Sequence, residues 1–189
     1  MIEQLRIEDT EVNRILALEE GHYLDLKRAE IMPAKLTQAV SAFANTAGGE
    51  LFIGIEESNR NGVKDRRWRG FADIEEANAH IQAIEAMSPL GTHYRASFLS
   101  AAGQAGQVLH LIIFKTKDIL CASDGFAYVR RGAQKQVVKG DDALQRLRLD
   151  KGIFSFEDET AAVDPTVITN SAAVIGFMLN VVPTAEPDT

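Results

Sequence analysis

The chain has 189 residues, 46% of them hydrophobic and 25% charged, which is typical of one globular domain with at most a small appendage. Its formal net charge of −7 and pI near 5.1 argue against non-specific coating of nucleic acid, because that activity needs a broadly basic surface. A single cysteine, Cys121, excludes an internal disulfide and a cysteine-rich zinc site, and it favours a reducing, cytoplasmic location.

The first part of the chain alternates between helix and strand signals. Apolar residues at near-helical spacing predict an amphipathic helix over residues 3–19, and alternation predicts a half-buried strand over residues 22–27. Pro33, followed by an apolar stripe, predicts a helix that ends at the glycine pair 48–49. Residues 50–56 (ELFIGIE) then read as a buried strand.

The middle of the chain continues the mixed pattern. We expect a polar, basic loop over residues 59–69 and a helix over residues 74–87. A short helix capped by Asp141 or Asp142 is expected after the last strand. Strands are predicted over 93–99, 108–114 and 127–130, the first two joined through the glycines of 103–106.

The C-terminal part differs in composition, being acidic over residues 155–166 and apolar over residues 172–182. That apolar run is too short to span a membrane, and the first residues do not resemble a signal peptide, so no membrane association is expected. We predict an N-terminal helix (1–19), a central domain (20–150) and a linker with an apolar tail (151–189). The predicted fold class is α+β, a small mixed sheet packed by two to three helices in a single lobe.

Basic residues are clustered although the total charge is negative, and an acidic total can hide a local basic patch. One group lies in the expected loop and the other surrounds the last predicted strand. Their members are candidate nucleic-acid contacts: Lys64, Arg66, Arg67, Arg130, Arg131 and Lys135.

Acidic residues bracket the first predicted strand. Asp25 and Lys27 share one face, Glu20 lies just before, and Glu57 follows the strand of residues 50–56. If the two strands are neighbours, these carboxylates converge at a strand end, where Mg²⁺ or Mn²⁺ would balance their charge. The alternative is that Asp25 and Lys27 form the solvated face of an amphipathic strand, and spacing alone favours this alternative.

Other chemistries find little support. The four histidines are scattered without metal-ligand spacing, and no phosphate-binding GxxxxGK[ST] motif occurs, so no nucleotide cofactor is expected. The segment from Asn45 to Gly49 could bind phosphate through its backbone, but a helix cap leading into a strand is the favoured interpretation.

Residues 41–57 (SAFANTAGGELFIGIEE) resemble the signature of Schlafen AlbA-type domains, a helix end followed by a strand and two acids. Upstream, Glu20 and the segment 25–27 (DLK) are similar to a second element of that family. Downstream, residues 126–132 (FAYVRRG) are similar to its tyrosine-valine-arginine strand and turn. Together the three motifs cover roughly residues 18–139.

The resemblance implies two functions. In animal Schlafens this domain is an endoribonuclease that cleaves tRNA and rRNA with three acids, a lysine and a divalent metal. The matching catalytic positions are Glu20, Asp25, Glu57 and Lys27, the three acids being the implied metal ligands. In many bacterial relatives the domain is described only as a DNA-binding or transcription-regulator module.

The sequence also departs from the animal pattern. The second acid is usually glutamate and the third aspartate, whereas Asp25 and Glu57 stand here. One cysteine cannot form the zinc site of the animal proteins. Those proteins build a groove from two lobes, so a single lobe would need a second copy or a partner subunit.

Three hypotheses follow. The first is a metal-dependent endoribonuclease acting on structured RNA such as tRNA, in bacterial stress or phage defence, with RNA favoured over DNA. The second is a non-catalytic DNA- or RNA-binding module. The third is an assembly subunit, homo-oligomeric or bound to a partner, that docks through the apolar tail; packing of this tail on its own domain is the favoured alternative.

Overall fold

A computed structural model of the chain describes residues 2–60, 63–153 and 165–181. It divides into two compact units, Met1–Phe154 and Ser155–Thr189. The first unit contains the central sheet and every residue discussed as a candidate site, so it is described first.

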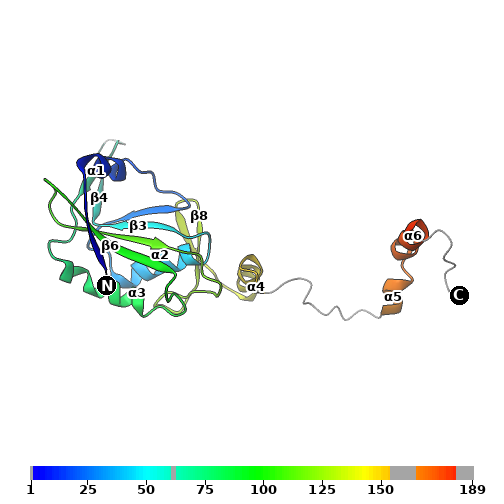
Figure 1. The fold of residues 1–189 in the computed structure, drawn as a ribbon. Coiled ribbons are helices and arrows are strands. Elements are labelled where there is room, and N and C mark those ends of the chain that lie inside the picture. The colour runs from blue at the N-terminus through cyan, green and yellow to red at the C-terminus, as the bar shows by residue number, and fades with distance from the viewer. Residues whose placement is uncertain (1, 61–62, 154–164, 182–189) are drawn as a thin grey trace. The chain divides into compact units, whose positions relative to one another are not determined.

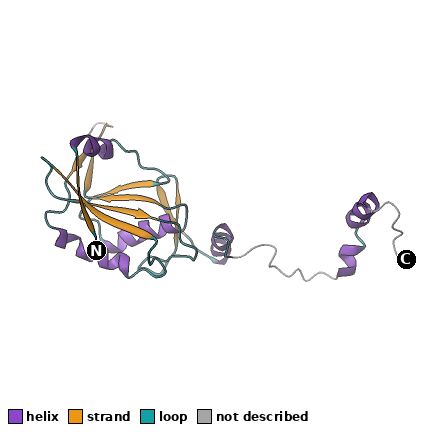
Figure 2. Ribbon diagram, viewed as in Figure 1, coloured by secondary structure: helices purple, strands orange, loops and turns teal. Residues whose placement is uncertain are grey.

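A five-stranded mixed sheet forms the centre of the first unit (Figure 2). Its strand order is β1-β6-β7-β3-β2, with parallel pairing of β1 to β6 and of β2 to β3 and antiparallel pairing elsewhere. This arrangement confirms the predicted α+β fold with a small mixed sheet, and it shows that the first strand and the strand after the helix are neighbours, the condition on which the convergence of acids was expected. The strands are β1 (Glu3–Ile7), β2 (Leu24–Lys27), β3 (Gly49–Ile53), β6 (Tyr94–Ala101) and β7 (Val108–Ile113).

Helices cover one face of the sheet (Figure 1). They are α2 (Pro33–Ala44), a 3-10 turn η1 (Ile74–Ala77) and α3 (Asn78–Glu85). Pro33 at the first turn and Gly48, whose φ is 78°, bound the α2 segment as predicted. Phe43 is fully buried against this face, in the larger of two hydrophobic clusters.

The opposite face is covered by α1 (Asp9–Leu16) and by a hairpin of β4 (Ile55–Arg60) and β5 (Val63–Trp68). Val12, Ile15 and Trp68 from these elements pack with Leu26 of β2 in the second cluster. Leu26 therefore points away from α2, as the predicted alternation of β2 requires.

A second hairpin, β8 (Tyr128–Arg131) and β9 (Gln134–Val137), packs along α2. The unit ends with α4 (Asp141–Asp150), whose N-cap is Gly140 with no side-chain hydrogen bond. The helix itself was predicted correctly. The prediction that Asp141 or Asp142 caps it was wrong, because the helix starts directly after Gly140, whose φ is 83°.

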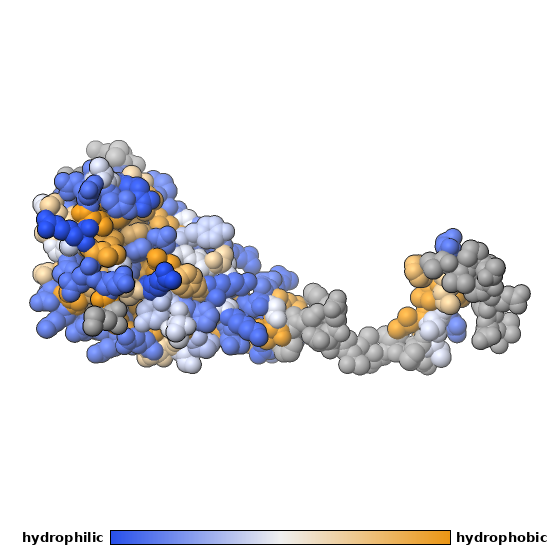
Figure 3. Space-filling model, in the orientation of Figure 1, coloured by the Kyte–Doolittle hydropathy of each residue, from blue (hydrophilic) through white to orange (hydrophobic). Residues whose placement is uncertain are grey.

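The C-terminal unit contains α5 (Pro165–Thr169) and α6 (Ala172–Val181). Figure 3 shows hydrophobic residues on its surface, and Phe177 is 66% exposed. Within the described ranges no helix is long and apolar enough to cross a membrane. Docking of this tail on a partner or a second copy stays a prediction. The acidic segment 155–164 and the end 183–189 lie outside the described residues.

Three expected elements differ from the structure. Residues 3–7 form β1 rather than the start of a helix, because they pair with β6 far along the chain. The strand expected over residues 50–56 divides at Gly54, where φ is 117° and a Cβ would lie 2.8 Å from the Cα of Gly70. The expected basic loop contains β5, which pairs with β4.

Candidate functional site at the edge of the sheet

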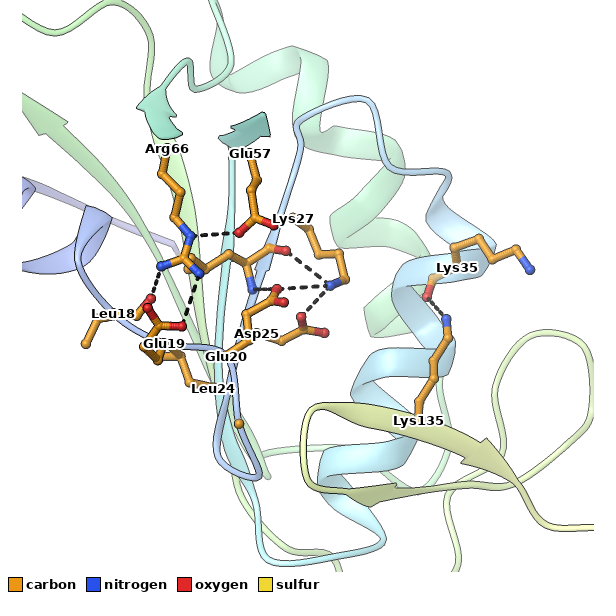
Figure 4. A network of polar contacts seen from close by, with 12 residues as sticks. Leu18, Glu19, Glu20, Leu24, Asp25, Lys27, Lys35, Glu57, Arg66 and Lys135 are labelled. Atoms are coloured by element: carbon orange, nitrogen blue, oxygen red, sulfur yellow. Dashed lines mark hydrogen bonds and ion pairs between the residues drawn. The ribbon is translucent and has the colours of Figure 1, made fainter. Parts of the chain in front are cut away.

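The candidate site lies on β2, an edge strand of the sheet, where Lys27 joins two of the predicted acids (Figure 4). The Lys27 ammonium donates a short hydrogen bond to Oδ1 of Asp25 and lies 3.7 Å from Oε1 of Glu20. The same Glu20 oxygen accepts the backbone N–H of Leu26 at 3.0 Å, so this side chain also satisfies an outward-facing strand donor. Glu20, Asp25 and Lys27 therefore come together as the sequence predicts.

Arg130 of β8 holds the other oxygen of Asp25. Its Nη1 donates to Oδ2 at 3.2 Å, while Nε and Nη2 each donate at 2.7 Å to the carbonyls of Gly21 and Leu24. The guanidinium also lies 4.4 Å from the ring centroid of Phe43. Asp25 is only 5% exposed and Arg130 only 2%, so this contact is a buried ion pair.

Glu57 belongs to a different set of contacts, in the β4–β5 hairpin. Its Oε2 accepts from Nε of Arg66, the residue opposite on β5, at 2.9 Å, and its Oε1 lies 3.5 Å from the Lys64 ammonium. Arg66 also donates a short hydrogen bond to the carbonyl of Leu18, and its side chain is 5% exposed. Glu57 is thus paired across its own hairpin.

The predicted metal ligands Glu20, Asp25 and Glu57 do not form a ligand set in this arrangement. Across residues 2–60, 63–153 and 165–181, no group of three or more histidine, cysteine, aspartate or glutamate side chains is placed to hold a metal ion. The physical reason is charge compensation, because lysine and arginine groups occupy the positions around these carboxylates that a cation would take. Gly54 turns the chain from β3 into the β4–β5 hairpin before Glu57, whose ion pairs with Lys64 and Arg66 lie within that hairpin.

Residues 41–46 (SAFANT) attach the β8–β9 hairpin to α2 through side-chain hydrogen bonds. The Asn45 side chain accepts from the N–H of Leu120 and donates to its carbonyl, both at 2.8 Å, and it also donates to the carbonyl of Tyr128 at 3.0 Å. Ser41 Oγ and Thr46 Oγ1 accept the N–H groups of Tyr128 and Arg130, each at 3.0 Å. The helix-cap interpretation is supported by Asn45 at the C-cap of α2 and by φ of 78° at Gly48, while the side-chain contacts place Arg130 against Asp25.

Two further lysines lie beside this site, on the side of α2 (Figure 4). Lys135 of β9 donates to the Gln38 side chain at 2.8 Å, and both Lys35 and Lys135 are exposed. Loss of hydration lowers the pKa of Lys135, and the positive charges of Lys35 and Lys27 lower it further. The sequence prediction missed Lys35, although its place in the first turn of α2, off the apolar stripe, indicated an exposed cation.

The other basic residues that were predicted to contact nucleic acid differ in how deeply they are buried. Arg66 and Arg130 were predicted to contact nucleic acid, but both are buried in intramolecular pairs and serve the fold. Arg67 is exposed and pairs with Asp65 at 2.9 Å. Arg131 is exposed on β8, next to the buried Arg130. The alternation of β8 thus separates two adjacent arginines into a structural and a surface residue.

Comparison with known proteins adds to this description. The sequence matches the family described as Schlafen, AlbA_2 over residues 20–139. Among curated proteins no match was found. One similar solved structure is the solution NMR structure of the N-terminal domain of a protein from Nitrosomonas europaea related to the ATP-dependent DNA helicase RecG. It is 22% identical, with a TM-score of 0.49 over 66% of this chain and 88% of that domain.

A second similar structure is that of the DIP2311 protein from Corynebacterium diphtheriae, 18% identical with a TM-score of 0.50. The match covers 92% of this chain and 33% of that protein, so the chain spans about a third of its length. This likeness concerns the fold. The family match covers more than half of the chain and includes all three motifs, the edge-strand acids, the SAFANT helix end and β8. The chain therefore belongs to the Schlafen AlbA_2 family.

Proposed function

We propose that the protein is a nucleic-acid-binding domain and that a lysine face formed by Lys27, Lys35 and Lys135 contacts the phosphate backbone. The observation that carries the proposal is the placement of Lys35 and Lys135 together beside Lys27, with the Lys135 ammonium 3.4 Å from the backbone carbonyl of Lys35 (Figure 4). Like charges held close repel one another, and a polyanion relieves that repulsion. Membership in the Schlafen AlbA_2 family supports the same class of ligand.

The distribution of charge fits selective rather than indiscriminate binding. With a net charge of −7, most of the surface repels a polyanion, so binding depends on a local basic face. One acid beside this face is neutralised internally, since Asp25 pairs with both Lys27 and Arg130, whereas the carboxylate of Asp124 also lies close enough to act on Lys135. The resemblance to RNA-cleaving relatives ranks RNA ahead of DNA as the ligand.

The proposal is tested by fluorescence anisotropy of labelled RNA and DNA over a series of salt concentrations. The double variant Lys35→Gln/Lys135→Gln should bind RNA more weakly and show a salt slope smaller by about 2, because roughly one unit is lost per phosphate contact. Lys117→Gln is the matched control, since Lys117 is also exposed and lies outside the lysine face. Equal slopes for the wild type and the double variant would reject this face.

Endoribonuclease activity on structured RNA such as tRNA is the second candidate. The observation that favours it is the meeting of Glu20, Asp25 and Lys27 on the edge strand of the sheet, where the Lys27 side chain is 30% exposed. A lysine there can offset the charge that develops on a transferring phosphate, and a carboxylate can accept a proton. A requirement for Mg²⁺ or Mn²⁺ stays a prediction.

Cleavage is tested by incubating the full chain with tRNA, with Mg²⁺ or Mn²⁺ and with chelator. Glu20→Gln is the informative variant, since the amide oxygen can still accept the Leu26 N–H while the charge is lost. Glu19→Gln is its control, because the Glu19 side chain is 81% exposed one residue away. Cleavage by the wild type and Glu19→Gln but not by Glu20→Gln supports the activity. Identical fragments from all three proteins would assign cleavage to a contaminant.

A further inference from the structure

A second basic feature lies beside the β8–β9 hairpin, where the hairpin, the end of α2 and α4 line an open cavity of about 500 Å³. Thr46 lines it from the α2 end, Val137 from β9 and Leu147 from α4. It shares no residue with the lysine face. A cavity of this volume falls within the range that accommodates small ligands such as nucleotides.

Positive charge dominates the lining of this cavity. Arg131, Lys139, Arg146 and Lys115 line it, against one carboxylate, that of Asp150. Arg130 also lines the cavity, but its guanidinium is committed to Asp25. In a chain with a net charge of −7, this excess of cations around one cavity is a strong local departure from the average.

The cations of the cavity are largely available to a ligand. In the described part of the chain, Arg131, Lys139 and Arg146 have no ion-pair partner, and all three are exposed. Lys115 donates only to the backbone carbonyl of Asp150, at 3.3 Å. A guanidinium left without a carboxylate presents a planar fork of donors that matches two oxygens of a phosphate group.

A buried cation adds to the field beside the cavity. The Lys151 ammonium donates to the carbonyls of Ala44 and Thr116, at 3.1 and 2.7 Å. These two residues neighbour Asn45 and Lys115 of the cavity lining in sequence. The same hydrogen bonds dock α4 against the end of α2, so the cavity is part of the packed unit.

We propose that this cavity is a binding site for the phosphate group of a nucleotide, either free or within a strand. The geometry supplies guanidinium donors from β8 and α4, and ammonium donors from the segments after β7 and β9, around a volume large enough for the phosphate and its sugar. The lysine face and the cavity are independent sites, because different residues form them. A nucleic-acid strand bound at the lysine face does not require the cavity, and a free nucleotide in the cavity does not require the lysine face.

The test uses the full chain labelled with ¹⁵N and titrated separately with inorganic phosphate, AMP and a short single-stranded RNA. Saturable shifts of the amide signals of Thr46, Lys139 and Arg146 are expected with AMP or with the RNA. AMP binding identifies a free nucleotide as sufficient, and binding of the RNA alone identifies the strand as the source of the phosphate. Arg146→Gln should weaken this binding roughly tenfold, as expected for losing one charge-assisted hydrogen bond.

Arg6→Gln is the matched control, since it makes the same charge change at an exposed position of β1, outside the cavity. Arg131→Gln provides a second variant on a different element. The proposal is overturned if none of the three probes shifts these amides, or if Arg146→Gln and Arg131→Gln both titrate like the wild type. Lys35→Gln/Lys135→Gln should retain AMP binding, so failure of the lysine face and failure of the cavity are distinguishable.

Discussion

Arg130 and Asp25 form a buried ion pair that joins the β8–β9 hairpin to the edge strand β2, with 3.2 Å between Nη1 and Oδ2. Replacing Arg130 with alanine removes this pair, two hydrogen bonds to backbone carbonyls and the contact with the Phe43 ring. We expect a loss of about 3 to 5 kcal/mol in the free energy of unfolding, because the Asp25 charge would stay buried without its partner. Urea denaturation followed by circular dichroism measures it.

The neighbouring Arg131→Ala is the control for this prediction, because Arg131 is exposed on the same strand. Its effect on the free energy of unfolding should stay within about 0.5 kcal/mol. Equal destabilisation by the two substitutions would contradict the structural role of Arg130.

Asn45 is the second position with a testable structural role. Asn45→Asp keeps the size of the side chain but removes the donor that reaches the carbonyls of Leu120 and Tyr128. It also places a carboxylate beside carbonyl oxygens at a site that is 3% exposed. We expect destabilisation by about 2 to 3 kcal/mol. Hydrogen exchange should be faster at the Leu120 and Tyr128 amides, while the amides of β6 and β7 change less. Unchanged exchange at both the Leu120 and the Tyr128 amide would contradict this role of Asn45.

Gly54 separates β3 from β4 and thereby directs Glu57 into its own hairpin. Gly54→Ala should destabilise the fold by about 2 kcal/mol or more, because the residue has φ of 117° and the new Cβ would lie 2.8 Å from the Cα of Gly70. Gly103→Ala isolates the conformational part of this effect, since Gly103 has φ of 80° with nothing within 4 Å of an added Cβ. In thermal unfolding, the melting temperature should decrease clearly more for Gly54→Ala than for Gly103→Ala.

The elements of the fold that could be predicted from the sequence are those whose sequence patterns are local. The α2 helix was predicted because Pro33, the apolar stripe and Gly48 lie close together in the sequence. The strand β1 was missed because its residues are largely exposed, so no alternation marks them, and its partner β6 is distant in the sequence. Pairing with a distant strand thus overrode the local helical spacing.

The candidate site likewise combines residues that local sequence signals indicate with contacts that depend on distant residues. The family resemblance grouped Glu20, Asp25 and Lys27, which lie on or beside one strand, although their spacing alone favoured a solvated strand face. The sequence could not show that Arg130, 105 residues from Asp25, neutralises this carboxylate, because only the hairpin's docking on α2 brings the two together. For the same reason Arg130 and Arg66 were predicted as surface contacts, whereas the structure buries them.

The buried lysine beside the cavity gives a prediction for pH. Burial lowers the pKa of Lys151 from 10.5 to about 8, the charge of Lys115 contributes in the same direction, and Asp118 opposes it. Because the unfolded chain then binds the proton more tightly than the folded one, the free energy of unfolding should rise as the pH increases above about 8. This rise is best measured below pH 10. The pKa of Tyr128 is raised to about 12, so above its ordinary value of 10 the titration of this tyrosine lowers the free energy of unfolding as the pH increases.

Urea denaturation of the wild type and of Lys151→Met between pH 7.5 and roughly 9.5 measures this contribution directly. The variant should be less stable at every pH, because the carbonyls of Ala44 and Thr116 lose a donor. Its stability should rise less with pH than that of the wild type, and the lowered pKa of Lys135 accounts for a remaining rise. Parallel curves for the two proteins would show that Lys151 titrates normally. Binding of a phosphate in the adjacent cavity should raise the pKa of Lys151, because a nearby anion favours the charged ammonium, and so shift the rise in stability to higher pH.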